Sequence, residues 1–155
     1  MSMQPTHNYA ARRQEGFTLT EVLVAVIVLS IGLLGLAGLQ ANSLKFNHSA
    51  YMRSQATHLA YSITDKMRAN RSPALQGAYD VGLDETVSGS TVASQDLAAW
   101  KALIQSRLPD GKGGVCRSSN GNTCSGSGNI IIVDVQWDDS RGAESAQTFR
   151  FVTAL

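Results

Sequence analysis

An apolar run near the N-terminus constrains this 155-residue chain more than any other feature. From residue 17 to residue 39 the side chains are almost wholly apolar, and the one ionisable group among them is Glu21. A run of this length can cross a bilayer, which takes about 17–25 residues. Arg12 and Arg13 precede it, and positive charges on that side direct the N-terminus to the cytoplasm. The sequence therefore predicts one membrane-spanning helix, with the rest of the chain outside the inner leaflet.

The helix is expected to continue well past the membrane. Residues 42–70 contain no proline or glycine. Apolar side chains recur there at three- and four-residue spacing, which puts them on one face: Met52, Ala56, Leu59, Ala60, Ile63 and Met67. The other faces carry Arg53, His58, Thr64, Asp65 and Arg68. Pro73 ends the pattern, because the residue before a proline is disfavoured in a helix.

A helix from Phe17 to about Asn70 is about 80 Å long at about 1.5 Å per residue. That is too long for the core of so small a domain. Its first half must therefore be buried in something else: lipid, partner helices, or each in turn.

Residues 72–93 are rich in Gly, Ser and Thr, and are predicted as a loop with one short strand. Ser94 is the expected N-cap of the next helix, with Asp96 in its first turn. Its apolar face comprises Leu97, Trp100, Leu103, Ile104 and Leu108. Residues 109–111, Pro-Asp-Gly, end this helix.

Alternating side chains predict the strands. A short strand is expected at Val115–Cys116 and a longer one over residues 129–137, followed by a turn over residues 138–142 and a returning strand over residues 149–153. The wholly apolar set of the long strand should face the core: Ile131, Val133, Val135 and Trp137. The expected fold class is α+β, with a long N-terminal transmembrane helix and a small head of one helix on an antiparallel sheet.

Residues 16–21 read Gly-Phe-Thr-Leu-Thr-Glu and stand between a basic leader and the apolar run. This segment resembles the class III signal sequence of type IV pilins and pseudopilins. The resemblance implies that a prepilin peptidase cuts between Gly16 and Phe17 and N-methylates Phe17. The glutamate of the family motif falls on Glu21. Thr20 departs from the family pattern, in which isoleucine is common, although its side chain is similar in bulk.

Residues 21–40 look closer still to minor pilins of the PilV pilus-modification type, and Cys116 and the strand that ends at Trp137 are also similar to that group. The resemblance implies a non-enzymatic subunit that helps to prime type IV pilus assembly and influences motility and adhesion. It implies four kinds of partner: the major pilin, other minor pilins, the prepilin peptidase and the inner-membrane assembly platform. No cofactor is expected.

The resemblance also implies the location and the division of the chain. The protein would cross the inner membrane once, with its N-terminus cytoplasmic and its head periplasmic, and then enter the pilus at the cell surface. The expected parts are a leader (1–16), a membrane and filament-core helix (17–40), the soluble half of that helix (41–71) and the head (72–155).

Glu21 also has a physical reason to act in assembly. A charged residue at the bilayer centre costs on the order of 2.5–3.5 kcal/mol, and Glu21 lies near the end of the segment, where the cost is lower. Cleavage after Gly16 would create a positive amine at Phe17, on the same helix face as Glu21. Glu21 can pair with this amine or with that of a neighbouring subunit, and we favour the second, which sets the axial register. The alternative is that Glu21 only reaches the lipid headgroups.

Cys116 and Cys124 lie in a stretch rich in Ser, Asn and Gly. Behind an export signal, such a pair predicts one disulfide. The bridge would contribute about 2–3 kcal/mol and would hold residues 117–123 in place. A metal site is disfavoured, because no second cysteine pair and no nearby histidine accompany these two.

Other chemistries have little support in the sequence. The net charge of +1 leaves no basic surplus for nucleic-acid binding. His48 and His58 fall on different helix faces, and no serine–histidine–acid or cysteine–histidine set suggests an enzyme. Three acids near the predicted turn could hold calcium, although a solvated turn is the simpler interpretation: Asp134, Asp138 and Asp139. Trp100 and Trp137 are expected in the core.

Three rival interpretations stay open. A pseudopilin of a type II secretion system shares the N-terminus and its chemistry. A membrane-anchored periplasmic binding module or enzyme would keep residues 1–16. An ordinary signal peptide has a shorter apolar region of about 7–15 residues, and only a poor cleavage site exists at residues 39–41.

Overall fold

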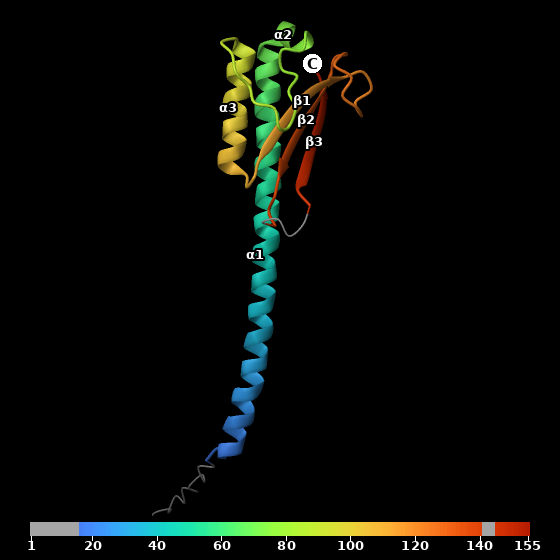
Figure 1. Cartoon of the computed structure of the whole chain (residues 1–155). Helices are drawn as coiled ribbons and strands as arrows, with labels where there is room; N and C mark the ends of the chain where they lie inside the picture. The colour runs from blue at the N-terminus through green and yellow to red at the C-terminus, as the bar shows by residue number, and fades with distance from the viewer. Residues whose placement is uncertain (1–15, 141–144) are drawn as a thin grey trace, which may run out of the picture. The chain divides into compact units, whose positions relative to one another are not determined.

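The computed structural model describes residues 16–140 and 145–155. Its elements follow in the order α1 (Leu19–Ala69), α2 (Arg71–Leu75), α3 (Val92–Arg107), β1 (Lys112–Ser118), β2 (Ile130–Trp137) and β3 (Gln147–Ala154) (Figure 1). The chain divides into two units, one up to Leu44 and one from Lys45 onward. The predicted fold class, a long apolar N-terminal helix and a small α+β head, is confirmed. The predicted end of the membrane segment at residue 40 stays a prediction.

The first unit consists of the N-terminal half of α1. Its large apolar side chains from Leu19 to Leu44 are all at least half exposed. By length and composition, this helix is apolar enough to cross a membrane. The surface therefore needs lipid or other helices around it, because water would disfavour so much exposed apolar area.

From Lys45 onward, α1 packs into the head. The face predicted from periodicity is the buried one, with Met52, Ala56, Leu59, Ala60, Ile63 and Met67 at most 7% exposed. The prediction that Thr64 lies on another face is wrong, because Thr64 is fully buried. Its hydroxyl donates to the Ala60 carbonyl oxygen at 2.8 Å, which satisfies the polar group inside the core.

α2 was not predicted. The chain leaves α1 at Ala69 and forms this one short helix around Pro73. The proline lies inside the first turn of α2, where its missing N–H costs nothing.

The helix α3 begins earlier than predicted. Thr91, rather than Ser94, is its N-cap, and the Thr91 hydroxyl accepts a hydrogen bond from the Ser94 backbone N–H at 3.2 Å. Asp96 consequently lies beyond the first turn. The earlier start brings Ala93 onto the buried face with Leu97, Trp100 and Ile104, which explains why Thr91 is the better cap.

The sheet is antiparallel, with strand order β1-β2-β3. β2 buries the predicted set, Ile131, Val133, Val135 and Trp137, and Ile132 on its other face is buried too. β1 is longer than the predicted Val115–Cys116 strand because Gly113 and Gly114 join it. A Cβ at Gly113 would lie only 2.5 Å from Ile104 and 2.6 Å from Trp100, so glycine lets the strand approach α3.

The remaining predictions for the head have mixed outcomes. The short strand expected within residues 72–93 is reduced to one bridge between Val81 and Val115. Part of the predicted turn over residues 138–142 lies outside the described residues.

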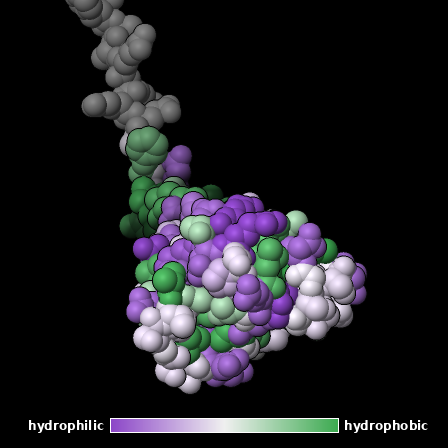
Figure 2. All heavy atoms as spheres, turned by 90° about the horizontal axis from the view of Figure 1, so that it is seen from above, coloured by the Kyte–Doolittle hydropathy of each residue, from purple (hydrophilic) through white to green (hydrophobic). Residues whose placement is uncertain are grey.

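α3 and the sheet pack around the C-terminal half of α1 (Figure 1). Seen from above, the head surface is largely hydrophilic with scattered hydrophobic residues (Figure 2).

Tyr79 connects three parts of the head through its hydroxyl, which donates to Asp96 Oδ2 at 2.8 Å and accepts from the Asn70 side-chain amide at 3.2 Å. Lys66 Nζ lies 3.2 Å from the other oxygen of Asp96. Burial raises the pKa of Tyr79, and the neighbouring Asp96 carboxylate raises this pKa further. Neutral Tyr79 is therefore the form that the folded head stabilises.

This raised pKa predicts an alkaline loss of stability. The folded pKa lies above the unfolded value of about 10, so the contribution is complete below that pH and is lost as the pH rises through the folded pKa. Tyr79→Phe should cost about 1 kcal/mol at neutral pH and should flatten the alkaline fall. Thermal unfolding of the wild type and Tyr79→Phe, as mature chains in detergent, measures this loss of stability from neutral pH to above about pH 10. An equally steep fall in Tyr79→Phe would contradict the assignment.

Candidate functional site

The predicted processing site lies in non-helical chain directly before α1. Gly16 and Phe17 are both exposed, with 84% of the Phe17 side chain accessible. A Cβ built on Gly16 meets no atom within 4 Å, so the surroundings in this chain do not require glycine there. Any requirement for glycine would therefore come from a processing enzyme. Cleavage between Gly16 and Phe17 stays a prediction.

Thr18 fixes where α1 begins. Its side-chain oxygen accepts from the Glu21 backbone N–H at 3.2 Å, and its carbonyl oxygen accepts from the Val22 N–H at 3.3 Å. The Thr-x-x-Glu spacing of Thr18 and Glu21 is the sequence signature of a capping box, and it could have predicted this start. The cap keeps the Gly16–Phe17 bond outside the helix and sets Glu21 in the first turn.

Glu21 is the one acid on an otherwise apolar surface. It borders a shallow groove on α1 that is lined by Thr18, Thr20, Glu21, Val24, Ala25, Val28 and Leu29. A carboxylate in the first turn of a helix is favoured by the helix dipole. In lipid or among apolar helices, it also favours a nearby positive group. The arrangement can thus hold a cation at the end of an apolar helix, as the predicted assembly role of Glu21 requires.

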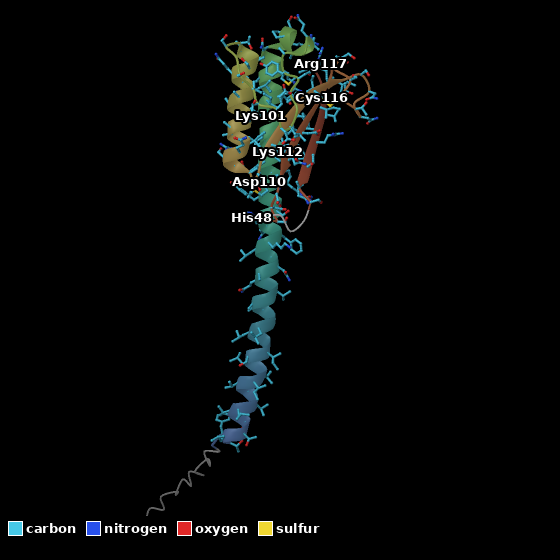
Figure 3. The ribbon with its side chains drawn as sticks, viewed as in Figure 1. His48, Lys101, Asp110, Lys112, Cys116 and Arg117 are labelled. Carbon is cyan, nitrogen blue, oxygen red and sulfur yellow. A yellow bond between two sulfur atoms is a disulfide. The ribbon has the colours of Figure 1, made fainter. Side chains whose placement is uncertain are left out.

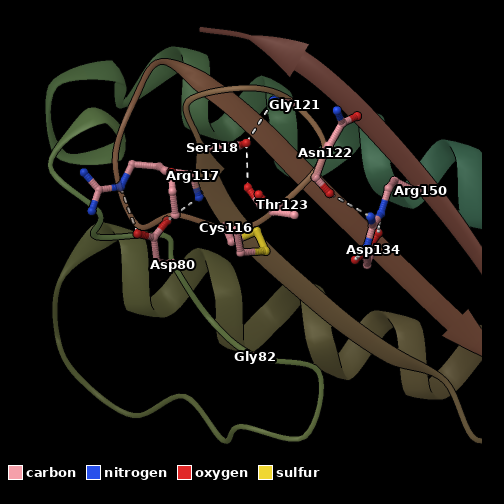
Figure 4. Close-up of a disulfide and its surroundings, with 12 residues drawn as sticks. Asp80, Gly82, Cys116, Arg117, Ser118, Gly121, Asn122, Thr123, Asp134 and Arg150 are labelled. Atoms are coloured by element: carbon pink, nitrogen blue, oxygen red, sulfur yellow. Dashed lines mark hydrogen bonds and ion pairs between the residues drawn. A yellow bond between two sulfur atoms is a disulfide. The ribbon is translucent and has the colours of Figure 1, made fainter.

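The predicted disulfide between Cys116 and Cys124 is present, with Cα atoms 5.6 Å apart (Figure 4). It closes a loop that has further hydrogen bonds of its own. The buried Ser118 hydroxyl donates to the Thr123 carbonyl oxygen at 2.6 Å and accepts from the Gly121 N–H at 2.9 Å. Ser118 could not be predicted from the sequence, because nothing in its local pattern separates it from the other serines of this stretch.

Removing the disulfide should lower the free energy of unfolding by about 2–3 kcal/mol. The reason is that the bridge restricts the unfolded chain, while the Ser118 hydrogen bonds hold the folded loop in either case. Thermal unfolding of the mature chain with and without reductant measures the difference. The double variant Cys116→Ala/Cys124→Ala is the control, since reductant should not change it. Two free thiols in the exported protein would contradict the assignment.

Asp80 and Arg117 attach the start of this loop to the rest of the head. Arg117 Nε donates to Asp80 Oδ2 at 2.8 Å, and its backbone N–H donates to Asp80 Oδ1 at 3.1 Å (Figure 4). A further guanidinium nitrogen of Arg117 donates to the Leu75 carbonyl oxygen at 2.8 Å. Side chain and backbone together therefore position the disulfide.

Lys101 organises a second loop, which the sequence pattern did not predict. Its ammonium group donates to the carbonyl oxygens of Gly82 at 2.7 Å, Leu83 at 3.3 Å and Glu85. Burial lowers the pKa of Lys101. Beside it, Lys112 pairs with Asp84 at 2.6 Å. A lysine that donates to three carbonyl oxygens is a structural clamp and has no hydrogen bond to spare for a ligand.

Two of the three acids considered for calcium, Asp134 and Asp138, have protein partners. Both oxygens of Asp134 accept from Arg150, at 2.8 and 2.7 Å, and Asp138 accepts from the backbone and the hydroxyl of Ser140. Within residues 16–140 and 145–155, no group of three or more potential ligands could hold a metal ion. The calcium interpretation thus gains no support from the described residues.

The histidines do not join the cysteines. His48 and His58 are both exposed on α1. Figure 3 places His48 at the opposite end of the head from Cys116 and Arg117. His48 instead borders a depression that also includes Lys45, Arg53 and Pro109. The two tryptophans are core residues, as predicted, each 2% exposed.

Comparison with protein families matches residues 11–37 to the prokaryotic N-terminal methylation motif. The matched segment contains Gly16, Phe17 and Glu21 and most of the apolar run. It indicates a type IV pilin-like protein, of a pilus or a pseudopilus. No curated protein matches the chain. No solved structure matches it.

Proposed function

We propose that the chain is a minor pilin of the PilV type, which helps to prime type IV pilus assembly and so contributes to pilus-dependent motility and adhesion. One observation carries the proposal: the match to the N-terminal methylation motif includes most of an apolar helical segment whose large side chains are at least half exposed. A helix of this kind has two natural environments, lipid before assembly and the helices of neighbouring subunits after it.

The mechanism follows from that change of environment. A prepilin peptidase cuts after Gly16 and methylates Phe17. The helix then leaves the bilayer and packs against its neighbours, where Glu21 pairs with the Phe17 amine of an adjacent subunit. Because a carboxylate and an amine in an apolar setting attract strongly, the pair fixes the axial position of the incoming subunit.

The head contributes contacts rather than catalysis. It stands on the periplasmic side of the inner membrane, and afterwards at the surface of the pilus. The disulfide between Cys116 and Cys124 supports this location, since disulfides persist in oxidising compartments. The proposed partners are the major pilin, other minor pilins, the prepilin peptidase and the inner-membrane assembly platform, without a cofactor.

A pseudopilin of a type II secretion system is the second candidate. The methylation motif and the apolar helix favour it equally, because both filaments use the same N-terminal chemistry. The two candidates differ in what the cell loses without the protein: surface pili in the first case, export of folded proteins in the second.

Deletion of the gene and complementation test the proposal. The complementing genes encode the wild type, Gly16→Val, which should block cleavage, and Gly82→Ala as a matched glycine control. A Cβ at Gly82 meets its nearest neighbour, Glu85, at 3.6 Å, which is ordinary contact. Sheared surface pili and secreted enzymes are quantified in the same cultures.

Loss of pili with secretion intact, restored by the wild type and Gly82→Ala but not by Gly16→Val, is the expected result. Intact pili with lost secretion would identify the protein as a pseudopilin. Full activity of Gly16→Val, with residues 1–16 retained, would contradict both and favour a plain membrane anchor.

A further inference from the structure

The two edges of the sheet differ in how their backbone groups are satisfied. On the β1 edge, the N–H and C=O of Val115 bond to Val81 at 2.9 and 2.8 Å. The Arg117 N–H donates to Asp80 at 3.1 Å, and the Arg117 carbonyl oxygen accepts from the Ser125 N–H at 3.0 Å. The chain itself therefore closes this edge at Val115 and Arg117.

The β3 edge is open. The Leu155 N–H donates to the Asn129 carbonyl oxygen at 3.0 Å, which extends the ladder and shows that the odd-numbered residues of β3 bond to β2. The even-numbered residues turn their backbone groups outward: Thr148, Arg150, Val152 and Ala154. Within the described part of the chain, these groups have one partner, the Thr153 hydroxyl, which donates to the Ala154 carbonyl oxygen at 3.3 Å.

β3 also lacks the usual protection of an edge strand. Natural edges carry lysine, proline or a bulge that prevents further pairing. β3 has neither lysine nor proline, and its register with β2 is uninterrupted. Its one charge, Arg150, is held against Asp134 on the neighbouring strand at 2.7 and 2.8 Å. The eight-residue strand is thus able to accept another strand.

α1 runs beside β3 in the same direction, and its side chains contact those of β3 next to the open edge. The Tyr61 and Phe151 rings lie 4.7 Å apart. Further along, Arg68 donates to the Thr153 hydroxyl at 3.3 Å. Tyr61 is still 47% exposed, so a strand added to β3 could cover it.

Most of the large exposed apolar side chains from Lys45 onward lie on the two elements that meet at this edge, α1 and β3. Among the described residues from Lys45 onward, the large exposed ones are Phe46, Tyr51, Tyr61, Val92 and Val152. All but Val92 lie on α1 or β3. α1 and β3 thus expose apolar side chains beside this edge, Tyr61 and Val152 among them.

We propose that the β3 edge binds an extended segment from the head of a different subunit of the same filament, antiparallel to β3. The inference rests on the proposed function. Subunits that enter a filament from the same membrane all have α1 pointing in the same direction. A second copy would thus present its β3 parallel to this one, which is the weaker pairing, and its β1 edge is closed at Val115 and Arg117. A different subunit can supply what a second copy lacks: an unpaired extended segment, with alternating apolar and polar residues, that runs antiparallel to β3.

Val152→Pro tests the edge. The Val152 N–H points away from β2, so proline there removes no existing ladder bond but blocks an added strand. Val152→Ala is the matched control, since it keeps the N–H. Each variant is expressed as the full chain in the deletion strain, with a photoactivatable phenylalanine analogue in place of Thr148. The readouts are incorporation into sheared filaments and the identity of the cross-linked protein.

The expected result is a cross-link to a different protein that carries its own N-terminal methylation motif. Val152→Pro should abolish this product and lower incorporation about tenfold, whereas Val152→Ala should retain both. If thermal unfolding shows that Val152→Pro destabilises the head, Val152→Asp replaces it, because a charge at the edge also opposes pairing.

Two results would overturn the proposal: wild-type incorporation and cross-linking in the edge-blocking variant, or a cross-link between two copies of this chain. Either can occur while filaments still depend on the protein, which would leave the proposed function intact. Filaments that do not depend on the protein at all would instead contradict the proposed function.

Discussion

Trp100→Ala is expected to lower the free energy of unfolding of the head by about 3–5 kcal/mol. Trp100 is 2% exposed, and its indole N–H donates to the Leu59 carbonyl oxygen at 2.8 Å. Its ring also lies directly against Gly113 in β1. One side chain therefore joins α1, α3 and the sheet, and alanine would leave a cavity at their junction.

Thermal or denaturant unfolding of the mature chain in detergent, followed by near-ultraviolet circular dichroism, measures this loss. Trp100→Phe should give an intermediate loss, because it retains most of the apolar volume but not the hydrogen bond to Leu59. Val92→Ala is the matched control on the same helix, since Val92 is 62% exposed. A Trp100→Ala variant within about 0.5 kcal/mol of the wild type would show that this junction does not stabilise the head.

Glu21→Ala should be processed normally and yet enter filaments poorly. In the proposed mechanism, the prepilin peptidase acts on the Gly16–Phe17 bond, which lies outside α1, whereas assembly uses the Glu21 carboxylate that the Thr18 cap sets in the first turn. Loss of an ion pair in an apolar setting should reduce incorporation by at least about tenfold, equivalent to about 1.4 kcal/mol. Immunoblots of membrane and sheared-filament fractions measure cleavage and incorporation in the same cells.

Two further variants assign the effect to the charge. Glu21→Gln keeps the shape of the side chain and should fail in the same way. Thr20→Ile, on the neighbouring residue, should assemble as the wild type does, because isoleucine at this position fits the resembled motif. Wild-type incorporation of Glu21→Ala after normal cleavage would contradict an assembly role and leave Glu21 as a residue that only reaches the headgroups.

The periodic elements of the fold could be predicted from the sequence because their patterns are local. The three- and four-residue spacing from Met52 to Met67 and the alternation from Ile131 to Trp137 both match the buried faces. β1 could not be predicted in full, since Gly113 looks like loop material until α3 packs against it. Thr64 was misplaced for a similar reason: a hydroxyl bonded within its own helix can be buried like an apolar group.

Some features of the candidate site could be predicted from the sequence and others could not. The match to the methylation motif spans residues 11–37, one continuous stretch of sequence, so it can be found without knowledge of the fold. The Thr18 cap could also have been predicted, from the spacing between Thr18 and Glu21. The role of Lys101 could not be predicted, because it depends on carbonyl oxygens from a distant loop. The open β3 edge could not be predicted either, because it depends on which strand lies at the edge of the sheet.

The most direct test of the account is the N-terminus of the mature protein. Surface filaments are sheared from cells, and the N-terminal peptide of this chain is identified by mass spectrometry. The account predicts that the chain is present in the filaments and begins at N-methylated Phe17. A chain that retains residues 1–16, or one cut near residues 39–41, would contradict it.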